Sequence, residues 1–492
     1  MSVSLTPPPG ATAPTRNLWV DVEDLFEYAA SQSRPSGIQR LSFEIYRAMV
    51  AEGAPAPRFC RHDRIGRTMR EVPWTEVERL FARLTARHPA PKPALDAAPR
   101  PPSGRLRRYA ARLPAEIRLP LGEAARSQQA SLRAALRTAR GVRAAWLQRR
   151  ASEAERADSP AAAGADLAEA GGPGDVLLAL GSPWSRADYA DIVRGLQRKT
   201  GMRFGLLVYD LIPLLRPEFC DHHLVRIFTA WYGSVLPLAD RVFTISRATA
   251  ADVSAFAARH GLALRSAPRP VPIGTGFPAG AGQEPPAPLP AGLAPGSYAL
   301  AVSTIEARKN HVLLFRVWRH LLDSRPAASV PKLVFAGRVG WLVADLMQQI
   351  ANTRNLDGHL VVVPEPSDAE LAALYRGCRF TLFPSLYEGW GLPITESLGF
   401  GKPCLSADRT SMPEAGGALA RYADPEHVGA WVEAVGRLID DPDGLAAWEA
   451  RVRREFEPVP WSATAAALRD GLDAEPLGVG PARAPSAGAA AR

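Results

Sequence analysis

Two glutamates lie eight positions apart in the stretch LYEGWGLPITE at residues 386–396. The preceding stretch RFTLFPS is typical of a buried strand, and the proline favours the start of a helix. Glycines in the connecting loop let backbone amides approach a ligand, and a helix N-terminus favours an anion. Glu388 and Glu396 would flank that anion and accept hydrogen bonds from hydroxyl groups. The spacing predicts a ligand that is anionic in the middle and carries hydroxyl groups at both ends, which is the layout of a nucleotide sugar.

A simpler interpretation remains open, in which Glu396 caps its helix and Glu388 is a solvated loop residue. A second motif, STIEARKNHVLL, favours the ligand-binding interpretation. Arg308 and Lys309 follow the strand-like stretch YALAV and precede a helix that is expected to begin near Asn310. An arginine and a lysine at such a corner suit the charge of a diphosphate. Solvated basic residues in a loop are the alternative.

The elements that would position these residues alternate between strands and helices. VLLAL, RFGLLVYD and RVFTIS are nearly continuous apolar runs, as expected for parallel strands that are covered on both faces. YALAVST, KLVFAG, HLVVVP, RFTLFPS and PCLSAD form a second series after a stretch rich in proline and glycine at residues 276–297. The predicted fold class is α/β, with two doubly wound Rossmann-like domains that face each other across a cleft. Ligands of such sheets bind at the carboxyl ends of the strands.

Composition suggests the domain boundaries. We expect a disordered tail at 1–16, an N-terminal domain at 17–288, a C-terminal nucleotide-sugar-binding domain at 289–456, a C-terminal helix at 457–475 and a second disordered tail at 476–492. Alanine, proline and arginine dominate about residues 90–173, which we interpret as an insertion in the first domain.

The net charge of +9 comes largely from one segment. Residues 100–150 hold thirteen arginines against two glutamates. A basic amphipathic helix there could contact a membrane surface, with a solvated helix as the alternative. A nucleic-acid partner is disfavoured because Tyr109 and Trp146 are the segment's only aromatic residues. Four widely spaced cysteines, no run long enough for a membrane span and no visible secretory signal predict a cytoplasmic protein. A membrane contact of the basic segment would make it peripheral at the inner membrane face.

The motif set as a whole resembles the family 4 glycosyltransferases, which have the GT-B fold. The resemblance rests on PSLYEGWGLPITESLGFGKPCLSADRTSMPEAGG, STIEARKNH, VFAGRVGW and PSDAELAALYRGC in the C-terminal half. VYDLIPLLRPEF, FTISRATAADV and VPIGTGF carry it in the N-terminal half. It covers about residues 17–52 and 174–472, and within the family it is most similar to bacterial mannosyl- or rhamnosyltransferases.

The resemblance implies roles for individual residues in binding the donor. Glu396 would bind the ribose hydroxyls, and Glu388 would contact the donor sugar near the reacting carbon. Arg308 and Lys309 would hold the diphosphate and help it to leave. The remaining donor-binding candidates are backbone positions in two loops: Gly389, Trp390, Gly391, Leu392 and Gly37.

The resemblance implies that the N-terminal domain at 17–288 is the acceptor side, and Asp210 in that domain is the second catalytic candidate beside Glu388. Tyr209 precedes it where many relatives have a histidine, so no histidine acts at that point. Asp210 could instead cap a loop. His222 and His223 could line the acceptor side, although a structural or solvated role suits them better.

The resemblance implies a retaining transfer of a hexose, with mannose favoured, from a nucleotide diphosphate sugar such as GDP-mannose. The acceptor would be a glycan or a lipid-linked glycan in surface polysaccharide synthesis. No cofactor or metal is required, because arginine and lysine can neutralise the leaving diphosphate. Two alternatives remain: a GT-B-fold nucleotide-sugar epimerase, and a non-catalytic nucleotide-sugar-binding scaffold.

Overall fold

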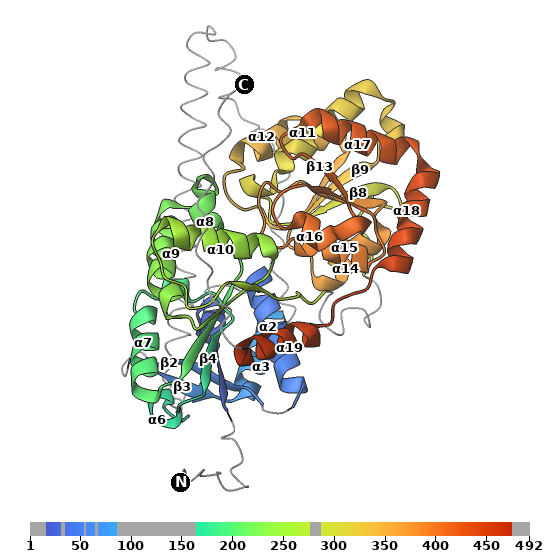
Figure 1. Ribbon diagram of the computed structural model, residues 1–492. Coiled ribbons are helices and arrows are strands. Elements are labelled where there is room, and N and C mark those ends of the chain that lie inside the picture. The colour runs from blue at the N-terminus through green and yellow to red at the C-terminus, as the bar shows by residue number, and fades with distance from the viewer. Residues whose placement is uncertain are drawn as a thin grey trace, which may run out of the picture.

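The computed structural model describes residues 16–30, 35–53, 56–63, 67–85, 164–275 and 287–474. These residues form two α/β domains, each built on a central sheet (Figure 1). The N-terminal sheet has the order β3-β2-β1-β4-β5-β6-β7, and the C-terminal sheet has the order β10-β9-β8-β11-β12-β13. Every pairing is parallel except that of β2 with β3. Two doubly wound domains of this kind confirm the predicted GT-B fold class.

The strands of the N-terminal sheet are β1 (Leu18–Asp21), β2 (Arg58–Asp63), β3 (Thr68–Val72), β4 (Val176–Ala179), β5 (Arg203–Val208), β6 (Arg241–Thr244) and β7 (Arg269–Pro270). Those of the C-terminal sheet are β8 (Tyr298–Val302), β9 (Lys332–Ala336), β10 (Leu360–Val363), β11 (Phe380–Phe383), β12 (Cys404–Ala407) and β13 (Arg421–Ala423). Strands β1, β4, β11 and β12 are buried along their whole length. Their near-continuous apolar sequences are explained by helices on both faces of each sheet.

The helices of the N-terminal domain are α1 (Glu23–Ala29), α2 (Gly37–Ala51), α3 (Trp74–Thr85), α6 (Leu167–Ala170), α7 (Tyr189–Thr200), α8 (Ile212–Leu215), α9 (His222–Val235) and α10 (Arg247–Arg259). Those of the C-terminal domain are α11 (His311–Ser324), α12 (Ala344–Asn352), α13 (Arg354–Asp357), α14 (Asp368–Gly377), α15 (Leu392–Gly399), α16 (Met412–Gly416), α17 (Val428–Asp440) and α18 (Pro442–Glu455). Short 3-10 turns lie at η1 (Pro183–Ser185), η2 (Pro217–Phe219), η3 (Leu236–Leu238), η4 (Ala307–Lys309), η5 (Ala327–Ser329) and η6 (Gly417–Leu419).

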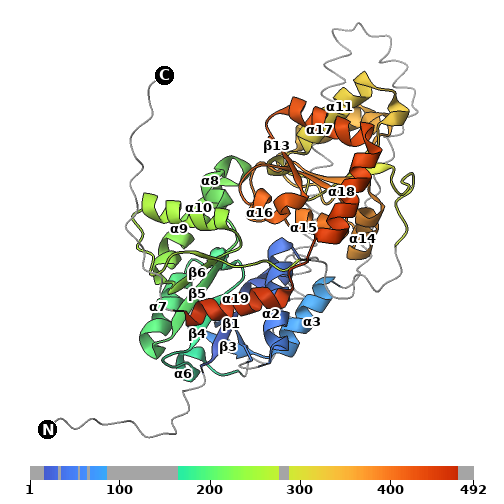
Figure 2. The same ribbon diagram turned by 45° about the vertical axis from the view of Figure 1, so that its right-hand side comes forward.

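The last helix, α19 (Trp461–Asp473), returns to the N-terminal domain and packs against α2 (Figure 2). Ala465, Leu468 and Leu472 are buried in the same apolar cluster as residues of β1, α2 and α3. The Trp461 ring lies so close to Gly274 that a Cβ at that glycine would sit 2.2 Å from it. The N-terminal core is therefore completed by the C-terminal end of the described chain.

The described part of the N-terminal domain includes residues 164–173, which the composition assigned to the insertion. Asp166 caps α6 by accepting a hydrogen bond from the Ala168 amide. The Asp166 carboxylate also accepts one from the Thr68 hydroxyl at 2.7 Å, and Asp166 forms a bridge with Arg70 of β3. These contacts attach this end of the alanine-rich stretch to the sheet edge.

Polar contacts also join the two domains. The Glu414 carboxylate of α16 accepts hydrogen bonds from the amides of Arg247 at 2.9 Å and Ala248 at 2.8 Å, which are the first two residues of α10. On the same helix, Asp252 accepts a hydrogen bond from the Tyr387 hydroxyl at 2.7 Å. Because the first amides of a helix have no partner within it, Glu414 caps α10 from the other domain.

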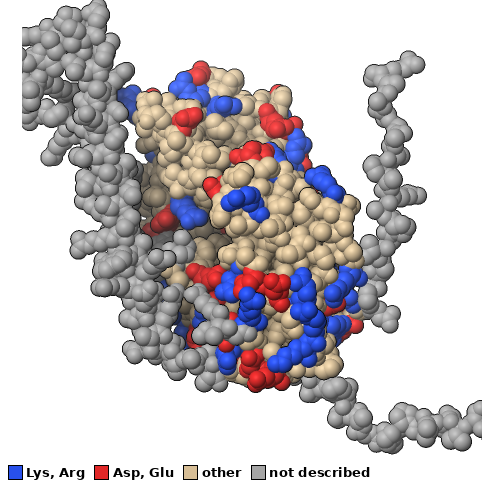
Figure 3. Space-filling view, turned by 90° about the vertical axis from the view of Figure 1, so that its left-hand side faces the viewer, with Lys and Arg blue, Asp and Glu red and all other residues tan. Residues whose placement is uncertain are grey.

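Charged side chains of both signs are interspersed on the face shown in Figure 3. No helix among the described residues is both long and apolar enough to cross a membrane. Nearly all of the two predicted tails and of the predicted insertion, and the whole basic segment at 100–150, lie outside the described residues. The predicted membrane contact therefore stays a prediction.

The cap that Glu414 provides gives a testable prediction for domain positioning. Replacing Glu414 with alanine should broaden the interdomain distance distribution towards longer distances and destabilise α10 by about 1 kcal/mol, because two helix amides lose their acceptor. Double electron–electron resonance spectroscopy, with spin labels attached at positions Arg79 and Glu433, would measure the distances between the domains. Glu426→Ala, which removes an exposed carboxylate of the same domain, is the control. An unchanged distribution in Glu414→Ala would contradict the role of this contact.

Candidate active site

The corner between β8 and α11 carries the two predicted cations. Asn310 adopts a left-handed conformation (φ 58°), which turns the chain from η4 into α11. Its side-chain amide donates hydrogen bonds to the carbonyls of Pro384 at 3.2 Å and Pro425 at 2.9 Å. The Leu386 amide in turn donates to the Arg308 carbonyl at 2.9 Å. The carboxyl ends of β8 and β11 are therefore bound together before any side-chain charge is considered.

Glu388 forms ion pairs with both cations. Its carboxylate lies 2.9 Å from an Arg308 guanidinium nitrogen and 2.5 Å from the Lys309 ammonium. Arg308 also pairs with Glu306 at 2.7 Å and donates to the Tyr387 carbonyl at 2.6 Å. The three side chains at the centre of this cluster are at most 15% exposed. The fold thus brings three of the predicted site residues, Arg308, Lys309 and Glu388, into direct contact.

The charges in this cluster shift each other's pKa. Burial by itself would raise the pKa of Glu388, but Arg308 and Lys309 lower it to about 2. Burial is the largest influence on Lys309, whose pKa is lowered, with the Arg308 charge acting in the same direction. The Arg308 pKa is raised, because the glutamate charges outweigh burial. Glu388 is therefore a carboxylate at every physiological pH.

Asp210 belongs to the same cluster although it comes from the other domain. It follows β5, and its carboxylate accepts a hydrogen bond from the Ile212 amide at 3.0 Å. Burial raises its pKa, while the charges of Arg308 and Lys309 act against that change. Gly389 lies directly against it, because a Cβ at this glycine would sit 2.2 Å from the Tyr209 carbonyl oxygen and 3.1 Å from the Asp210 Cβ. A side chain at 389 would separate the domains at this point.

The loop after Glu388 is packed between the two domains. Gly391 has a positive φ of 111° and precedes α15, which begins at Leu392. Trp390 packs against apolar clusters of both domains, and its indole nitrogen is buried without a partner among the described residues. Leu392 packs against the N-terminal cluster. The predicted loop positions thus lie at the interdomain boundary.

Glu396 lies on α15, away from the ion cluster. Its carboxylate accepts a hydrogen bond from the Tyr375 hydroxyl at 2.7 Å. Burial raises its pKa, and the Tyr375 hydrogen bond and the Arg40 charge act against that change. Arg40 of α2 forms an ion pair with Asp368 at 2.8 Å. This contact brings the first turn of α2, which starts at the predicted Gly37, towards Glu396. A Cβ added at Gly37 would meet no atom within 4 Å.

The histidine candidates are not part of this arrangement. His222 and His223 are exposed at the N-terminus of α9, and His223 contacts Arg226. Tyr209, which precedes Asp210, is buried and donates to the Leu180 carbonyl.

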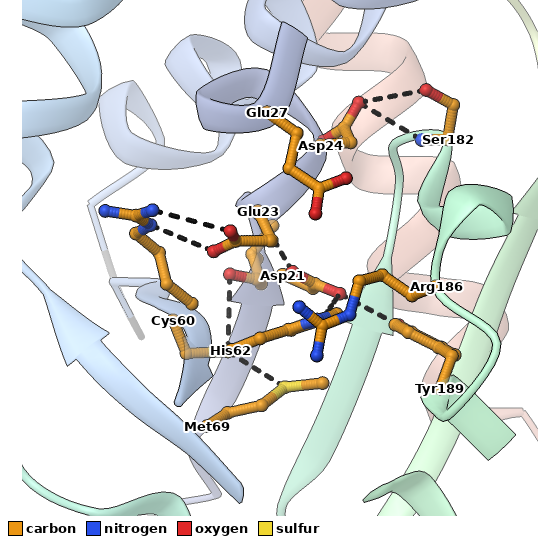
Figure 4. A network of polar contacts seen from close by, with 12 residues as sticks. Asp21, Glu23, Asp24, Glu27, Cys60, His62, Met69, Ser182, Arg186 and Tyr189 are labelled. Atoms are coloured by element: carbon orange, nitrogen blue, oxygen red, sulfur yellow. Dashed lines mark hydrogen bonds and ion pairs between the residues drawn. The ribbon is translucent and has the colours of Figure 1, made fainter. Parts of the chain in front are cut away.

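Sequence reasoning assigned no role to a polar network after β1, which Figure 4 shows from close by. Asp21 accepts hydrogen bonds from His62 at 3.0 Å and Tyr189 at 2.9 Å. Asp24, which is 6% exposed, accepts from the Ser182 amide at 3.1 Å and from Gln39 of α2 at 3.4 Å. Burial and the Asp21 charge raise the pKa of Asp24 to about 6.

The run DVED, which begins at the last residue of a buried strand, was the available signal for this network. It places carboxylates at the same sheet edge as Asp210, since β1, β4 and β5 are parallel neighbours. Asp24 belongs to α1 and accepts hydrogen bonds at that edge from Ser182, which follows β4, and from Gln39 of α2. It therefore helps to hold the first turn of α2, which faces the C-terminal domain.

Comparison with known proteins relates part of the chain to a described family. Residues 295–455 match the family described as glycosyl transferases group 1. The serotype-specific mannosyltransferase WbdA of Escherichia coli is 27% identical over 54% of this chain and 32% of WbdA. The O-antigen chain mannosyltransferase B of E. coli is 35% identical over 27% of this chain and 34% of that protein. The chain thus spans about a third of the length of the curated relatives it matches.

Among solved structures, Anabaena HepE in complex with UDP and glucose aligns with a TM-score of 0.44 and 16% identity, over 61% of this chain and 78% of HepE. That similarity is too low to support a conclusion. The family match is of a different kind, because it covers the whole segment that carries Arg308, Lys309, Glu388 and Glu396. The C-terminal domain of the chain therefore belongs to the group 1 glycosyl transferases, as the motifs predicted.

Proposed function

We propose that the chain is a retaining glycosyltransferase that transfers a hexose from a nucleoside diphosphate sugar to a glycan or lipid-linked acceptor. The observation that carries this proposal is the contact of Glu388 with both Arg308 and Lys309 where the two domains meet. Two nearly buried cations held on one carboxylate form a ready site for a doubly charged diphosphate. Glu388 would then be released to contact the donor sugar.

The expected chemistry is electrostatic. When the bond between the sugar and the diphosphate breaks, negative charge develops on the departing phosphate, and Arg308 and Lys309 would stabilise it. Because the cluster already supplies two positive charges, the proposal requires no divalent metal. In a front-face transfer the leaving diphosphate accepts the proton of the acceptor hydroxyl. Asp210, which shares the electrostatic environment of Arg308 and Glu388, would orient that hydroxyl.

Glu396 would bind the ribose hydroxyls. Its carboxylate is held by Tyr375, and it lies beyond the glycine loop, on the same helix that begins at Leu392. The amides of residues 389–392 and the glycine at position 37 would line the diphosphate and sugar from the two domains. This order reproduces the anionic middle and hydroxylated ends of a nucleotide sugar.

Mannose from a guanosine diphosphate donor is the favoured hexose, since WbdA and the chain mannosyltransferase B are named as mannosyltransferases. We place the reaction in surface polysaccharide synthesis at the cytoplasmic side of the membrane. The names of the same relatives, which refer to a serotype and to an O-antigen chain, support this setting.

The first test concerns the nucleotide. Glu396→Ala should lose most of the thermal stabilisation that GDP gives to the unchanged protein, and its affinity for GDP should fall about 10- to 100-fold, because buried hydrogen bonds to a charged group are lost. Calorimetry with GDP, UDP and their sugars would identify the nucleobase. Glu433→Ala, on the exposed face of α17, is the matched control. If the panel contains no binding nucleotide, or if Glu396→Ala binds as well as the unchanged protein, the proposed donor site is wrong.

The second test concerns competition for the cations. Glu388→Gln removes the negative charge that now neutralises Arg308 and Lys309, so inorganic diphosphate should bind about tenfold more tightly. Sugar transfer should nevertheless slow by about 100-fold, because the same carboxylate is needed at the sugar. Isothermal titration with diphosphate and a steady-state transfer assay would measure the two effects.

Glu433→Gln is the control for the change of charge, and circular dichroism would show whether Glu388→Gln is folded. Weaker diphosphate binding by a folded Glu388→Gln would show that the carboxylate supports the anion site and does not compete with it.

A further inference from the structure

Exposed apolar side chains gather on one loop of the C-terminal domain. Among the described residues, the exposed large hydrophobic side chains are Val339, Trp341 and Leu342, which are 47%, 48% and 62% exposed. All three belong to the 338–342 loop, which joins β9 to α12. Scattered apolar residues are common on protein surfaces, but a cluster confined to one loop indicates a binding surface.

This loop is built against the segment that leads to the cations. Gly337 has a φ of 150°, and a Cβ there would sit 2.0 Å from the Ser303 carbonyl oxygen. At Gly340 a Cβ would sit 2.7 Å from the Thr304 side chain and 3.4 Å from the Glu306 Cβ. Glu306 is the ion-pair partner of Arg308. The two glycines therefore hold the 338–342 loop beside the proposed diphosphate site.

The ring of Trp341 also contacts the acceptor-side domain. Its indole nitrogen donates a hydrogen bond to the Phe219 carbonyl of η2 at 2.8 Å. The next residue, Cys220, lies close enough to Arg308 and Asp210 for both charges to act on its thiol. Trp341 thus lies at the edge of the reaction centre, between the domain that carries the donor site and the domain expected to hold the acceptor.

The chemistry of this position suits a sugar. The hydrogen bond satisfies the single polar atom of the indole and fixes the ring, while almost half of the side chain remains exposed. An aromatic face matches the apolar C–H face of a pyranose, and guanidinium groups match its hydroxyl edge. Arg338 is exposed on the same loop, and Arg216, 30% exposed, lies over the Phe219 ring at 4.8 Å.

We propose that the exposed face of Trp341 stacks on a sugar ring of the acceptor glycan, and that the 338–342 loop and η2 together form an acceptor subsite. This inference rests on the proposed glycosyltransferase function and adds that the acceptor is a saccharide with a ring within reach of the reaction centre. A membrane surface is disfavoured as the occupant, because Trp341 is bonded to the opposite domain and could not enter a bilayer without breaking that contact.

The test compares three replacements of one side chain. Trp341→Phe keeps an aromatic face, Trp341→Leu keeps apolar bulk without one, and Trp341→Ala removes both. With the GDP-loaded protein, α-linked mannotriose should bind about tenfold more weakly to the alanine and leucine variants and within about threefold of normal to the phenylalanine variant. Glu433→Ala, on the exposed face of α17 and outside the 338–342 loop, is the control and should change binding by less than about twofold. Calorimetry and saturation-transfer NMR would give the affinities.

The outcomes separate this inference from the proposed function. Tight GDP binding together with mannotriose that fails to bind, or that binds equally to all three Trp341 variants, would overturn the subsite and leave the donor site intact. Equal binding by the leucine and phenylalanine variants would overturn the stacking role. Loss of binding to phosphatidylglycerol vesicles in Trp341→Ala, with mannotriose unaffected, would assign the patch to the membrane instead. Failure of the unchanged protein to bind any nucleotide would contradict the proposed function itself.

Discussion

Two cations and one carboxylate, nearly excluded from water, determine how the rest of this molecule is built. Burying Arg308 and Lys309 without an anion would cost several kcal/mol, because charges lose their hydration in the protein interior. Glu388 offsets that cost, and the two residues reach it only because β8 and β11 are adjacent and end at the same edge of the sheet. The parallel topology of the C-terminal domain is therefore what makes the charge cluster possible.

The second domain is fitted to that cluster at short range. Asp210 approaches through a contact that only glycine permits at position 389. Glu414 and Tyr387 hold α10, and Arg40 holds α2. Each of these contacts joins a residue of the C-terminal domain to an element at the carboxyl end of the N-terminal sheet. The geometry of the site consequently depends on domain orientation as much as on either domain alone.

Much of this could be predicted because the informative residues have strong local preferences. The apolar runs predicted the central strands. Arg308, Lys309, Glu388 and Asp210 lie near one another, because each follows a strand that ends towards the boundary between the domains. Other elements lacked such signals. β2 and β3, with sequences RFCRHD and TMREV, contain charged residues because they lie towards one end of the sheet. The start of α2 at Gly37 likewise has no local signal, since glycine is a weak helix former.

Contacts between domains could not be predicted from the sequence at all. Glu414 was visible in MPEAGG, but nothing local distinguishes a carboxylate that caps a helix of another domain from one in solvent. The network of Asp21, His62 and Tyr189 lies within one domain, but it joins residues more than forty positions apart. It could not be predicted either, because no local pattern relates these residues. Pairings of this kind depend on the three-dimensional fold, and a single sequence has no record of them.

The return of α19 to the N-terminal domain has a consequence for synthesis of the chain. A ribosome releases the N-terminal domain long before residues 461–473 exist, so the apolar surface that Leu468 and Leu472 cover stays exposed while the whole C-terminal domain is made. The C-terminal domain, which is contiguous from β8 to α18, can fold before the first domain is finished. The domain made first is thus the one completed last, and a nascent chain that stalls before residue 461 would present an unfinished core to chaperones.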